Sequence, residues 1–340
     1  MGSGPVGDEV IVLIGLVVAF YMAWNLGAND AANPTDTAVG SGAITLRKAI
    51  LLFSVFAVIG ALLQGYKVIK TIGKGVVRDL DPLMALSASL AAGIWVTLAT
   101  RKGLPVSTTH STVGAVLGVG LTRWLVYGEV ERINWGVVAK VVLSWITSPL
   151  GAIVLAALLY ALFARLYSSL AARGVGVERL FQGILLFNLA FSAYAFGAND
   201  VGNATGVYVG VVGPVLGVPD AETMRLLALL GGAGIALGAF TWGYRVIMTV
   251  GFKITRLDYV SGAAAELANA SVVYLFTLLG MPVSTTHASV SSVIGVGIAR
   301  ERSLRGIDGH TVALIIAGWL LTVPIAAGLA SVIYILISHI

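Results

Sequence analysis

Long apolar runs separated by short polar segments dominate the hydropathy pattern of this chain. Spanning the hydrocarbon core of a bilayer takes about 20 apolar residues in a helix. The apolar runs cover about residues 9–26, 49–66, 83–99, 133–170, 180–196, 226–250, 261–279 and 311–338. This pattern predicts an all-α polytopic membrane protein with about ten to twelve membrane segments, partial ones included.

Polar residues, glycine and proline also occur inside these runs. The segment Gly27–Asn33 follows the first run directly, and Pro34 and Asp36 come next. We expect a broken helix here, with a second half-helix over about residues 37–45, because a lipid-facing helix would not carry these groups. Residues 133–170 contain Pro149 and predict either one long kinked helix or two spans.

Two motifs occur twice in the same order. Gly27-Ala-Asn-Asp-Ala-Ala-Asn33 returns as Gly197-Ala-Asn-Asp-Val-Gly-Asn203, at an offset of 197 − 27 = 170 residues. Pro105-Val-Ser-Thr-Thr-His110 returns unchanged as Pro282-Val-Ser-Thr-Thr-His287, at an offset of 282 − 105 = 177. We therefore expect two repeats, over residues 1–172 and 173–340, that each supply an equivalent part of one site. The hydropathy pattern leaves inverted and parallel repeats open.

The composition agrees with a membrane protein and excludes several other classes. Only 11% of residues are charged, against about 25% in soluble domains. The 42 glycines suit closely packed membrane helices. With no cysteine, disulfides and thiolate metal sites are excluded. The net charge of +5 is no nucleic-acid signal, because the basic residues lie at the ends of apolar runs. The first run lacks signal-peptide features and predicts a retained helix.

The Pro-Val-Ser-Thr-Thr-His motif is typical of a helix start, within a re-entrant hairpin or a pair of half-helices. Serine and threonine are good N-caps, and the first N–H groups of a helix bind anions. Two facing copies would surround one centre with hydroxyl donors, which suits a tetrahedral oxyanion. The alternative is simple capping of two buried helices. The hydroxyls are those of Ser107, Thr108, Thr109, Ser284, Thr285 and Thr286.

Asp30 and Asp200 are carboxylates within apolar surroundings, which is costly and indicates function. A carboxylate repels an oxyanion, so a positive charge must lie between them. No lysine or arginine lies within ten residues of Asp200. We therefore expect a small monovalent cation or a proton, with Asn29 and Asn199 as further oxygen ligands. The alternative is that these residues cap the broken helices.

His110 and His287 each follow a serine at i+3. A Ser-His pair with Asp30 would indicate an intramembrane hydrolase, but a triad needs one copy and both copies are intact. The rings are expected to orient the hydroxyl loops by a hydrogen bond, or else to sense pH or relay protons. Glu266 is unmatched, because position 266 − 177 = 89 is Ser89, and it predicts a cation site or a helix pairing.

With these motifs, the whole chain resembles the inorganic phosphate transporter (PiT) family of phosphate carriers, sodium–phosphate cotransporters and sulfate permeases. The resemblance rests on Gly27–Asn33 with Gly40-Ser-Gly42, Phe196–Asn203 and both Pro-Val-Ser-Thr-Thr-His copies. It implies an inverted repeat, a central oxyanion between two hairpin tips, and a homodimer. It also implies that the six hydroxyls bind the anion, and that Asn29, Asp30, Asn199 and Asp200 contribute to anion and sodium sites.

The sequence departs from the family pattern at Phe196, where histidine is frequent, and at Pro34–Thr37, where small residues are common. Both departures lie in the coupling-ion region. We expect a cation-coupled phosphate symporter of the cell membrane with sodium as coupling ion and no other cofactor, rather than an enzyme. A proton-coupled phosphate or sulfate permease is the alternative, and an anion channel or intramembrane phosphatase is a different class.

Overall fold

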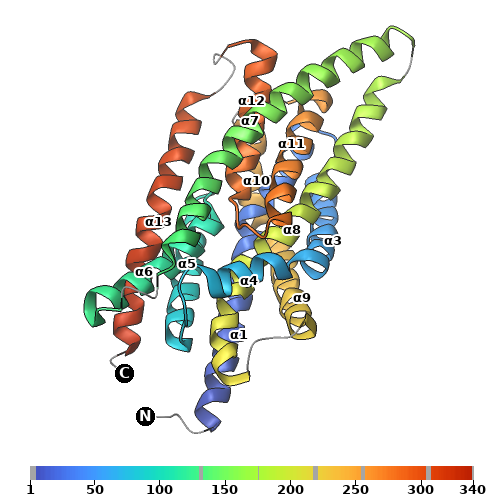
Figure 1. Cartoon of the computed structure of the whole chain (residues 1–340). Helices are drawn as coiled ribbons and strands as arrows, with labels where there is room; N and C mark the ends of the chain where they lie inside the picture. Colours follow the sequence, from blue (N-terminus) through green and yellow to red (C-terminus); the bar gives the residue numbers. More distant parts are fainter. Residues whose placement is uncertain are drawn as a thin grey trace.

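The computed structural model describes residues 5–129, 133–174, 176–216, 221–253, 257–303 and 308–338, and its elements are helices throughout (Figure 1). The first-half helices are α1 (Pro5–Asp30), α2 (Ala32–Gly40), α3 (Leu46–Gln64), α4 (Tyr66–Gly75), α5 (Pro82–Arg101), α6 (Thr108–Tyr127) and α7 (Trp135–Ala171). Then come α8 (Val177–Leu216), α9 (Ala221–Gly238), a π-helical turn η2 (Ala239–Gly243), α10 (Tyr244–Lys253), α11 (Tyr259–Leu278), α12 (Thr285–Glu301) and α13 (Gly309–Ser338).

The helical membrane architecture predicted from the sequence is confirmed. Seven helical segments in the described part of the chain are long and apolar enough to cross a bilayer. Three further helices of 17 to 20 residues, α6, α11 and α12, carry the hydroxyl-rich motifs and Glu266. The run over 133–170 is one helix, α7, with Pro149 inside it. The polar segment after α3 is partly helical, as α4, which crosses the long helices in Figure 1.

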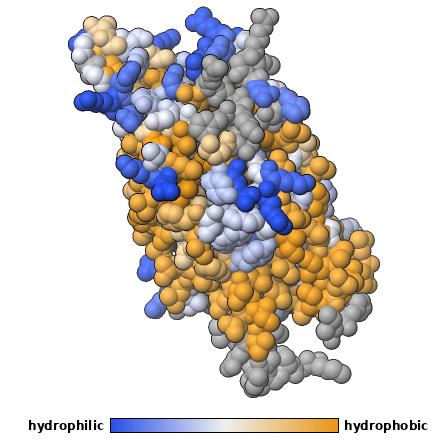
Figure 2. Space-filling model, turned by 180° about the vertical axis from the view of Figure 1, so that it is seen from behind, coloured by the Kyte–Doolittle hydropathy of each residue, from blue (hydrophilic) through white to orange (hydrophobic). Residues whose placement is uncertain are grey.

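The outer surface of the molecule is broadly apolar. Along α7, large apolar side chains point outward every four residues, from Ile146 (56% exposed) through Leu150, Val154 and Leu158 to Leu162. The space-filling view shows hydrophobic residues covering much of one face, with hydrophilic residues near its upper end and in a patch at its middle (Figure 2). An exposed apolar surface of this extent is the surface that a multi-pass membrane protein presents to lipid.

The helix break predicted after Gly27 is small in the first copy and absent from the second. Helix α1 ends at Asp30 and α2 begins at Ala32, so the interruption is one residue. Pro34 lies in the first turn of α2, where its missing N–H is tolerated. Helix α8 runs through Asn199, Asp200 and Asn203 without interruption. Within this continuous helix, the side chain of Asn199 is satisfied by groups of another element and its loop.

Glycines of the repeated Gly-Ala-Asn-Asp motif let helices cross at backbone contact. A Cβ atom on Gly27 of α1 would collide with the carbonyl oxygen of Ile235 in α9. A Cβ on Gly197 of α8 would collide with the carbonyl oxygen of Ala57 in α3. The first glycine of each motif therefore brings two helices close enough to position the Asn-Asp pair that follows.

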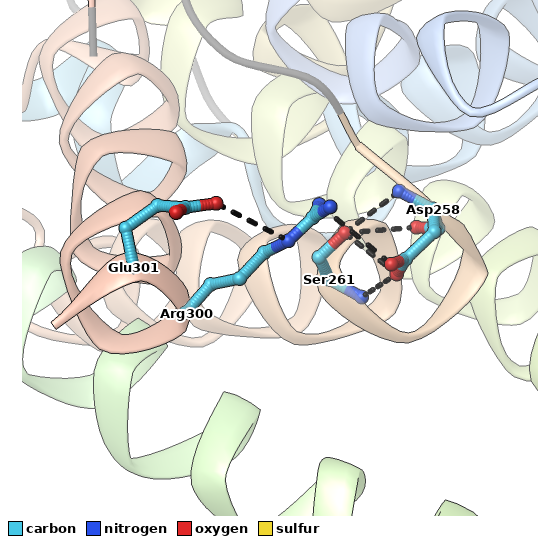
Figure 3. Close-up of polar contacts among 4 residues, drawn as sticks. All are labelled: Asp258, Ser261, Arg300 and Glu301. Atoms are coloured by element: carbon cyan, nitrogen blue, oxygen red, sulfur yellow. Dashed lines mark hydrogen bonds and ion pairs between the residues drawn. The ribbon is translucent and has the colours of Figure 1, made fainter. Parts of the chain in front are cut away.

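The start of α11 and the end of α12 are joined by polar contacts away from the centre of the molecule (Figure 3). Asp258 caps α11 in a capping box, in which its side chain accepts from the N–H of Ser261 and its own backbone N–H donates to the Ser261 hydroxyl. Arg300, in the last turn of α12, lies 3.7 Å from Asp258. These contacts fix the open end of the hairpin whose tip carries the second hydroxyl motif.

Replacing Gly197 with alanine should lower the thermal stability of the detergent-solubilised protein, because the new Cβ forces α3 and α8 apart. Overpacking of this kind costs about 1–3 kcal/mol. Gly183→Ala in the same helix is the matched control, since a Cβ there meets no atom within 4 Å. Equal melting temperatures for the two variants would contradict this account of the crossing.

Candidate functional site

Two helical hairpins, α5–α6 and α11–α12, carry the repeated hydroxyl motifs at their tips. Ser107 and Ser284 cap α6 and α12, accepting hydrogen bonds from the N–H groups of His110 (3.1 Å) and His287 (3.2 Å). The sequence therefore begins a helix at each motif, as predicted. Both helices continue well past the motif, α6 to Tyr127 and α12 to Glu301.

The two tips contact each other through reciprocal hydrogen bonds. The hydroxyl of Thr109 donates to the carbonyl oxygen of Val283 at 2.9 Å. The hydroxyl of Thr286 lies 3.3 Å from the carbonyl oxygen of Val106, the matching pair in the other direction. Thr109 and Thr286, which are 286 − 109 = 177 positions apart, thus make equivalent bonds to the opposite tip. The expectation that the two motifs face one another is met.

Asn29 and Asn199 each hold one motif loop in place. The amide of Asn29 donates to Thr100 (2.8 Å) and to the carbonyl oxygen of Leu104 (3.0 Å), and it accepts from the N–H of Val106 (3.1 Å). Asn199 makes the same three bonds with Thr277, Met281 and Val283, at 3.0, 3.1 and 3.2 Å. Each asparagine therefore joins a Gly-Ala-Asn-Asp motif to the loop that begins a Pro-Val-Ser-Thr-Thr-His motif. Their predicted role as sodium ligands stays a prediction.

Asp30 and Asp200 lie beside the tips, fully buried. Asp30 accepts a hydrogen bond from Thr108 (2.5 Å), and it shares the single hydroxyl proton of Thr286 (3.2 Å) with the carbonyl oxygen of Val106, so it contacts both hydroxyl motifs. Asp200 accepts from Asn203 at 2.9 Å, and its second carboxylate oxygen has no hydrogen-bond partner within the described residues. The two carboxyl groups lie close enough to interact electrostatically. The structure therefore brings the predicted acids and hydroxyls together at one centre.

Asn33 and Asn203, the last residues of the first motif, also belong to this centre, although sequence reasoning did not single them out. Asn33 donates to Thr285 (3.0 Å) and Thr286 (3.1 Å), and Asn203 donates to Thr109 (2.9 Å). Each thus crosses to the tip from the opposite half of the chain. The signal in the sequence was the shared Asn-Asp-x-x-Asn spacing, which places both polar groups on one helix face.

The histidine rings do not orient the hydroxyl loops as expected, since the backbone N–H groups make those bonds. The rings of His110 and His287 instead contact each other, with centroids 4.4 Å apart, and pack on Trp145 and Trp319 at 3.8 Å. Together with apolar side chains of α7 and α13 they line a cavity of about 390 Å³. Neither ring nitrogen of His110 has a hydrogen-bond partner in the described part of the chain. A proton-linked role stays a prediction.

Glu266 lies with Asp36 rather than at the centre with Asp30 and Asp200. The Thr37 hydroxyl donates to Glu266, and Asp36 accepts from Ser289 at 3.0 Å. Both acids are at most 1% exposed. Among the described residues, the buried acids therefore form two pairs: one at matched positions of the repeats, and one of residues without acidic counterparts.

The central arrangement can bind an anion and a cation at the same time. Hydroxyl groups and the N-termini of α6 and α12 offer donors and partial positive charge. The carboxylates and amide oxygens offer hard ligands for a cation. The described residues contain no group of three histidine, cysteine, aspartate or glutamate side chains that could hold a metal ion. The hydroxyl, carboxylate and amide groups suit the reversible binding of ions.

Replacing Asn199 with alanine should lower stability by about 2 kcal/mol, because it leaves the N–H of Val283 and the carbonyl oxygen of Met281 buried without their partner. Asn29→Ala should give a similar loss, because the bonds match. Thermal unfolding in detergent measures both, with Ser168→Ala as control, since that exposed hydroxyl bonds only to its own helix. A large loss for one asparagine alone would argue against equivalent roles.

Comparison with known proteins identifies the family. The model of the phosphate transporter family matches residues 26–330. A provisionally named phosphate permease of Pyrococcus furiosus is 35% identical, with 98% of each chain covered. The chloroplastic inorganic phosphate transporter 2-1 of Arabidopsis thaliana is 33% identical over 94% of this chain and 70% of its own length. A solved structure titled "The sodium-dependent phosphate transporter" has a TM-score of 0.87 and 32% identity, and covers 97% of this chain and 100% of its own. The chain belongs to the phosphate transporter family of multi-pass membrane proteins.

Proposed function

We propose that this phosphate transporter is a sodium-coupled symporter that carries phosphate inward by alternating access around the central site. One observation carries the proposal. The two hydroxyl-bearing tips meet beside two buried carboxylates that form no ion pair within the described residues. The similar solved structure is titled a sodium-dependent transporter, which supports sodium as the coupling ion.

Phosphate is held by the six hydroxyls of the tips, those of Ser107, Thr108, Thr109, Ser284, Thr285 and Thr286. Ser107 and Ser284 support this role, because each accepts a bond from a backbone N–H and keeps its own O–H proton for an anion. The threonine hydroxyls now bond to carboxylates, amides and carbonyl oxygens of the protein. Phosphate binding exchanges some of these bonds for bonds to the anion, so no basic side chain is needed and release stays possible.

Sodium is held next to the anion by Asp30 and Asp200, with Asn29 and Asn199 nearby. Asp200 has one carboxylate oxygen without a partner in the described chain, and Asn203 likewise has a free amide oxygen. Asp200 and Asn203 are three residues apart on α8 and so share one helix face, where a cation would balance the charge of the carboxylate. A cation there lowers the cost of burying the phosphate charge, and phosphate raises cation affinity by the same factor.

Alternating access follows from this linkage if the site reorients only when both phosphate and sodium are bound or when neither is bound. A single bound charge in the low-dielectric interior is costly, so partly loaded forms reorient slowly. The matched hydrogen bonds of the two halves support repeats over residues 1–172 and 173–340, which we propose are inverted. The homodimer expected from the family stays a prediction.

Uptake of labelled phosphate into proteoliposomes should follow an imposed sodium gradient and accumulate phosphate against its own gradient. A pH gradient alone should drive no accumulation, and an excess of sulfate should not displace phosphate. Flux without accumulation would indicate an anion channel. Accumulation driven by a pH gradient in sodium-free buffer would overturn the assignment of sodium.

Asp200→Asn should abolish sodium-driven phosphate uptake, with at least a hundredfold loss, because the substituted amide cannot balance the cation. Glu178→Gln is the matched control, since Glu178 is an exposed acid on the same helix. Initial uptake rates at saturating sodium measure the effect. Uptake at the level of the control variant would show that Asp200 is not part of the coupling site.

Thr108→Ala and Thr285→Ala should each raise the KM for phosphate about tenfold or more, because a hydrogen bond to a charged group contributes about 1.5–3 kcal/mol. Thr147→Ala should leave the KM unchanged, since this hydroxyl bonds only to its own helix. Uptake measured over a range of phosphate concentrations separates the KM from the maximal rate. A change in the maximal rate alone would indicate a role in reorientation rather than in binding.

A further inference from the structure

The cavity of about 390 Å³ behind the two tips, which His110 and His287 line, has no part in the proposed binding of phosphate or sodium. Its walls are built from equivalent residues of the two halves of the chain, which on α7 and α13 lie 319 − 145 = 174 positions apart. These residues are Val142, Trp145 and Ile146 of α7 and, in the same order, Ile316, Trp319 and Leu320 of α13. The cavity therefore lies where matching parts of the two halves meet.

This cavity lies near the middle of the membrane. Trp145 comes 145 − 135 = 10 residues after the start of α7, and Trp319 comes 319 − 309 = 10 residues after the start of α13. Ten residues of helix are about 15 Å long, which is half of a hydrocarbon core of about 30 Å. The two helices run in opposite directions in Figure 1, so the two distances are counted from opposite sides of the bilayer. Lipid headgroups do not reach this depth.

The cavity opens on the lipid-facing surface of the molecule. Two of its wall residues, Ile146 and Leu320, are 56% and 74% exposed. The outer face of α7 continues the same apolar surface beyond the cavity. Molecules that are dissolved in the hydrocarbon core can therefore enter, whereas polar solutes are excluded by the cost of leaving water.

The walls also carry polar atoms that have no hydrogen-bond partner among the described residues. They are the indole nitrogens of Trp145 and Trp319, both ring nitrogens of His110 and the Nε2 atom of His287. The two histidines are each 5% exposed. An indole nitrogen can only donate, and a neutral imidazole offers one donor and one acceptor. Donors thus outnumber acceptors, and a ligand with an acceptor atom would satisfy them.

Helices α7 and α13 each pack on one tip-bearing helix. A Cβ on Gly295 of α12 would lie 2.4 Å from the carbonyl oxygen of Ile153 in α7. A Cβ on Gly118 of α6 would lie 2.3 Å from the carbonyl oxygen of Ala327 in α13. At both crossings the backbones are in contact, so α7 with α12 and α13 with α6 form two closely packed pairs. Both pairs contribute to the cavity.

We propose that this cavity binds a lipophilic molecule from the bilayer that carries a hydrogen-bond acceptor, such as a carbonyl oxygen. The apolar walls hold its body, and the indole N–H groups donate to its acceptor. A molecule that contacts both helix pairs opposes the motion of one pair against the other. Because each pair carries one tip, the bound molecule slows phosphate transport without competing with phosphate. This effect on transport rests on the proposed alternating access, whereas the binding itself does not.

Benzophenone is a suitable probe, because it has an apolar body and one carbonyl acceptor. Under near-ultraviolet light its carbonyl takes a hydrogen atom from a neighbouring C–H group, and the two carbon radicals then join. In proteoliposomes it should label the peptides that contain Ile146 and Leu320, as mapped by mass spectrometry. Val142→Phe and Ile316→Phe fill the cavity and should abolish this labelling. Val154→Phe is the matched control on the same helix, since Val154 is 60% exposed and outside the cavity.

The role of the acceptor is tested by removing either donor or acceptor. The double variant Trp145→Phe/Trp319→Phe keeps two aromatic rings but loses both indole N–H groups. It should need about three- to tenfold more benzophenone for half-maximal labelling, as expected for the loss of neutral hydrogen bonds. Diphenylmethane, which has the same two rings without the carbonyl, should compete weakly with benzophenone. Equal competition would overturn the need for an acceptor and assign the cavity to a lipid chain.

Transport measurements separate this inference from the proposed function. Benzophenone should lower the maximal rate of phosphate uptake with an unchanged KM, and Val142→Phe should be insensitive to it. Labelling that persists in both cavity-filling variants, or crosslinks between two copies at α7, would overturn the ligand site. Labelling of the site with no effect on uptake would overturn the inhibition and leave the binding. If the wild type is labelled at the site but does not accumulate phosphate in a sodium gradient, the proposed function fails and the ligand site stands. A single symmetric peak in size-exclusion chromatography checks the fold of each variant.

Discussion

The reciprocal contact between the two hydroxyl loops is the interaction on which the rest of this structure depends. Thr109 bonds to the backbone of the opposite tip, and Thr286 returns the bond. Because both tips are helix starts, two N-termini and six hydroxyls converge on one buried point. In the proposed function these groups bind the anion without lysine or arginine. They also satisfy Asp30, which would otherwise be a buried and unpaired acid.

Close helix packing is what brings the groups to this point. Gly27 and Gly197 allow backbone contact at two helix crossings, and the asparagines that follow them tie the motif loops to these helices. A larger side chain would separate the helices and move the carboxylates away from the tips. The Gly-Ala-Asn-Asp motif therefore has two roles. Its glycine allows close helix packing, and that packing places its polar side chains beside the tips.

Residues that match between the two halves and residues that do not match form different parts of the molecule. Matched residues of the two halves form the centre, where three hydrogen bonds of Asn29 recur at Asn199. Unmatched residues, Asp36 and Glu266, form a second acidic pair on one side only. A symmetric centre suits a substrate that must be released to either side of the membrane.

The sequence by itself determined the class of protein, the two pairs of motifs and the helix starts at Ser107 and Ser284, because apolar run length and capping chemistry are local properties. It overestimated the helix break in the second half, where α8 stays continuous through Asp200. It also gave the histidine rings a role that backbone N–H groups perform. Only the tertiary structure decided that Asn33 and Asn203 reach the opposite tips and that Glu266 pairs with Asp36. Those contacts join residues more than 90 positions apart, and no local pattern specifies which distant partner satisfies a buried polar group.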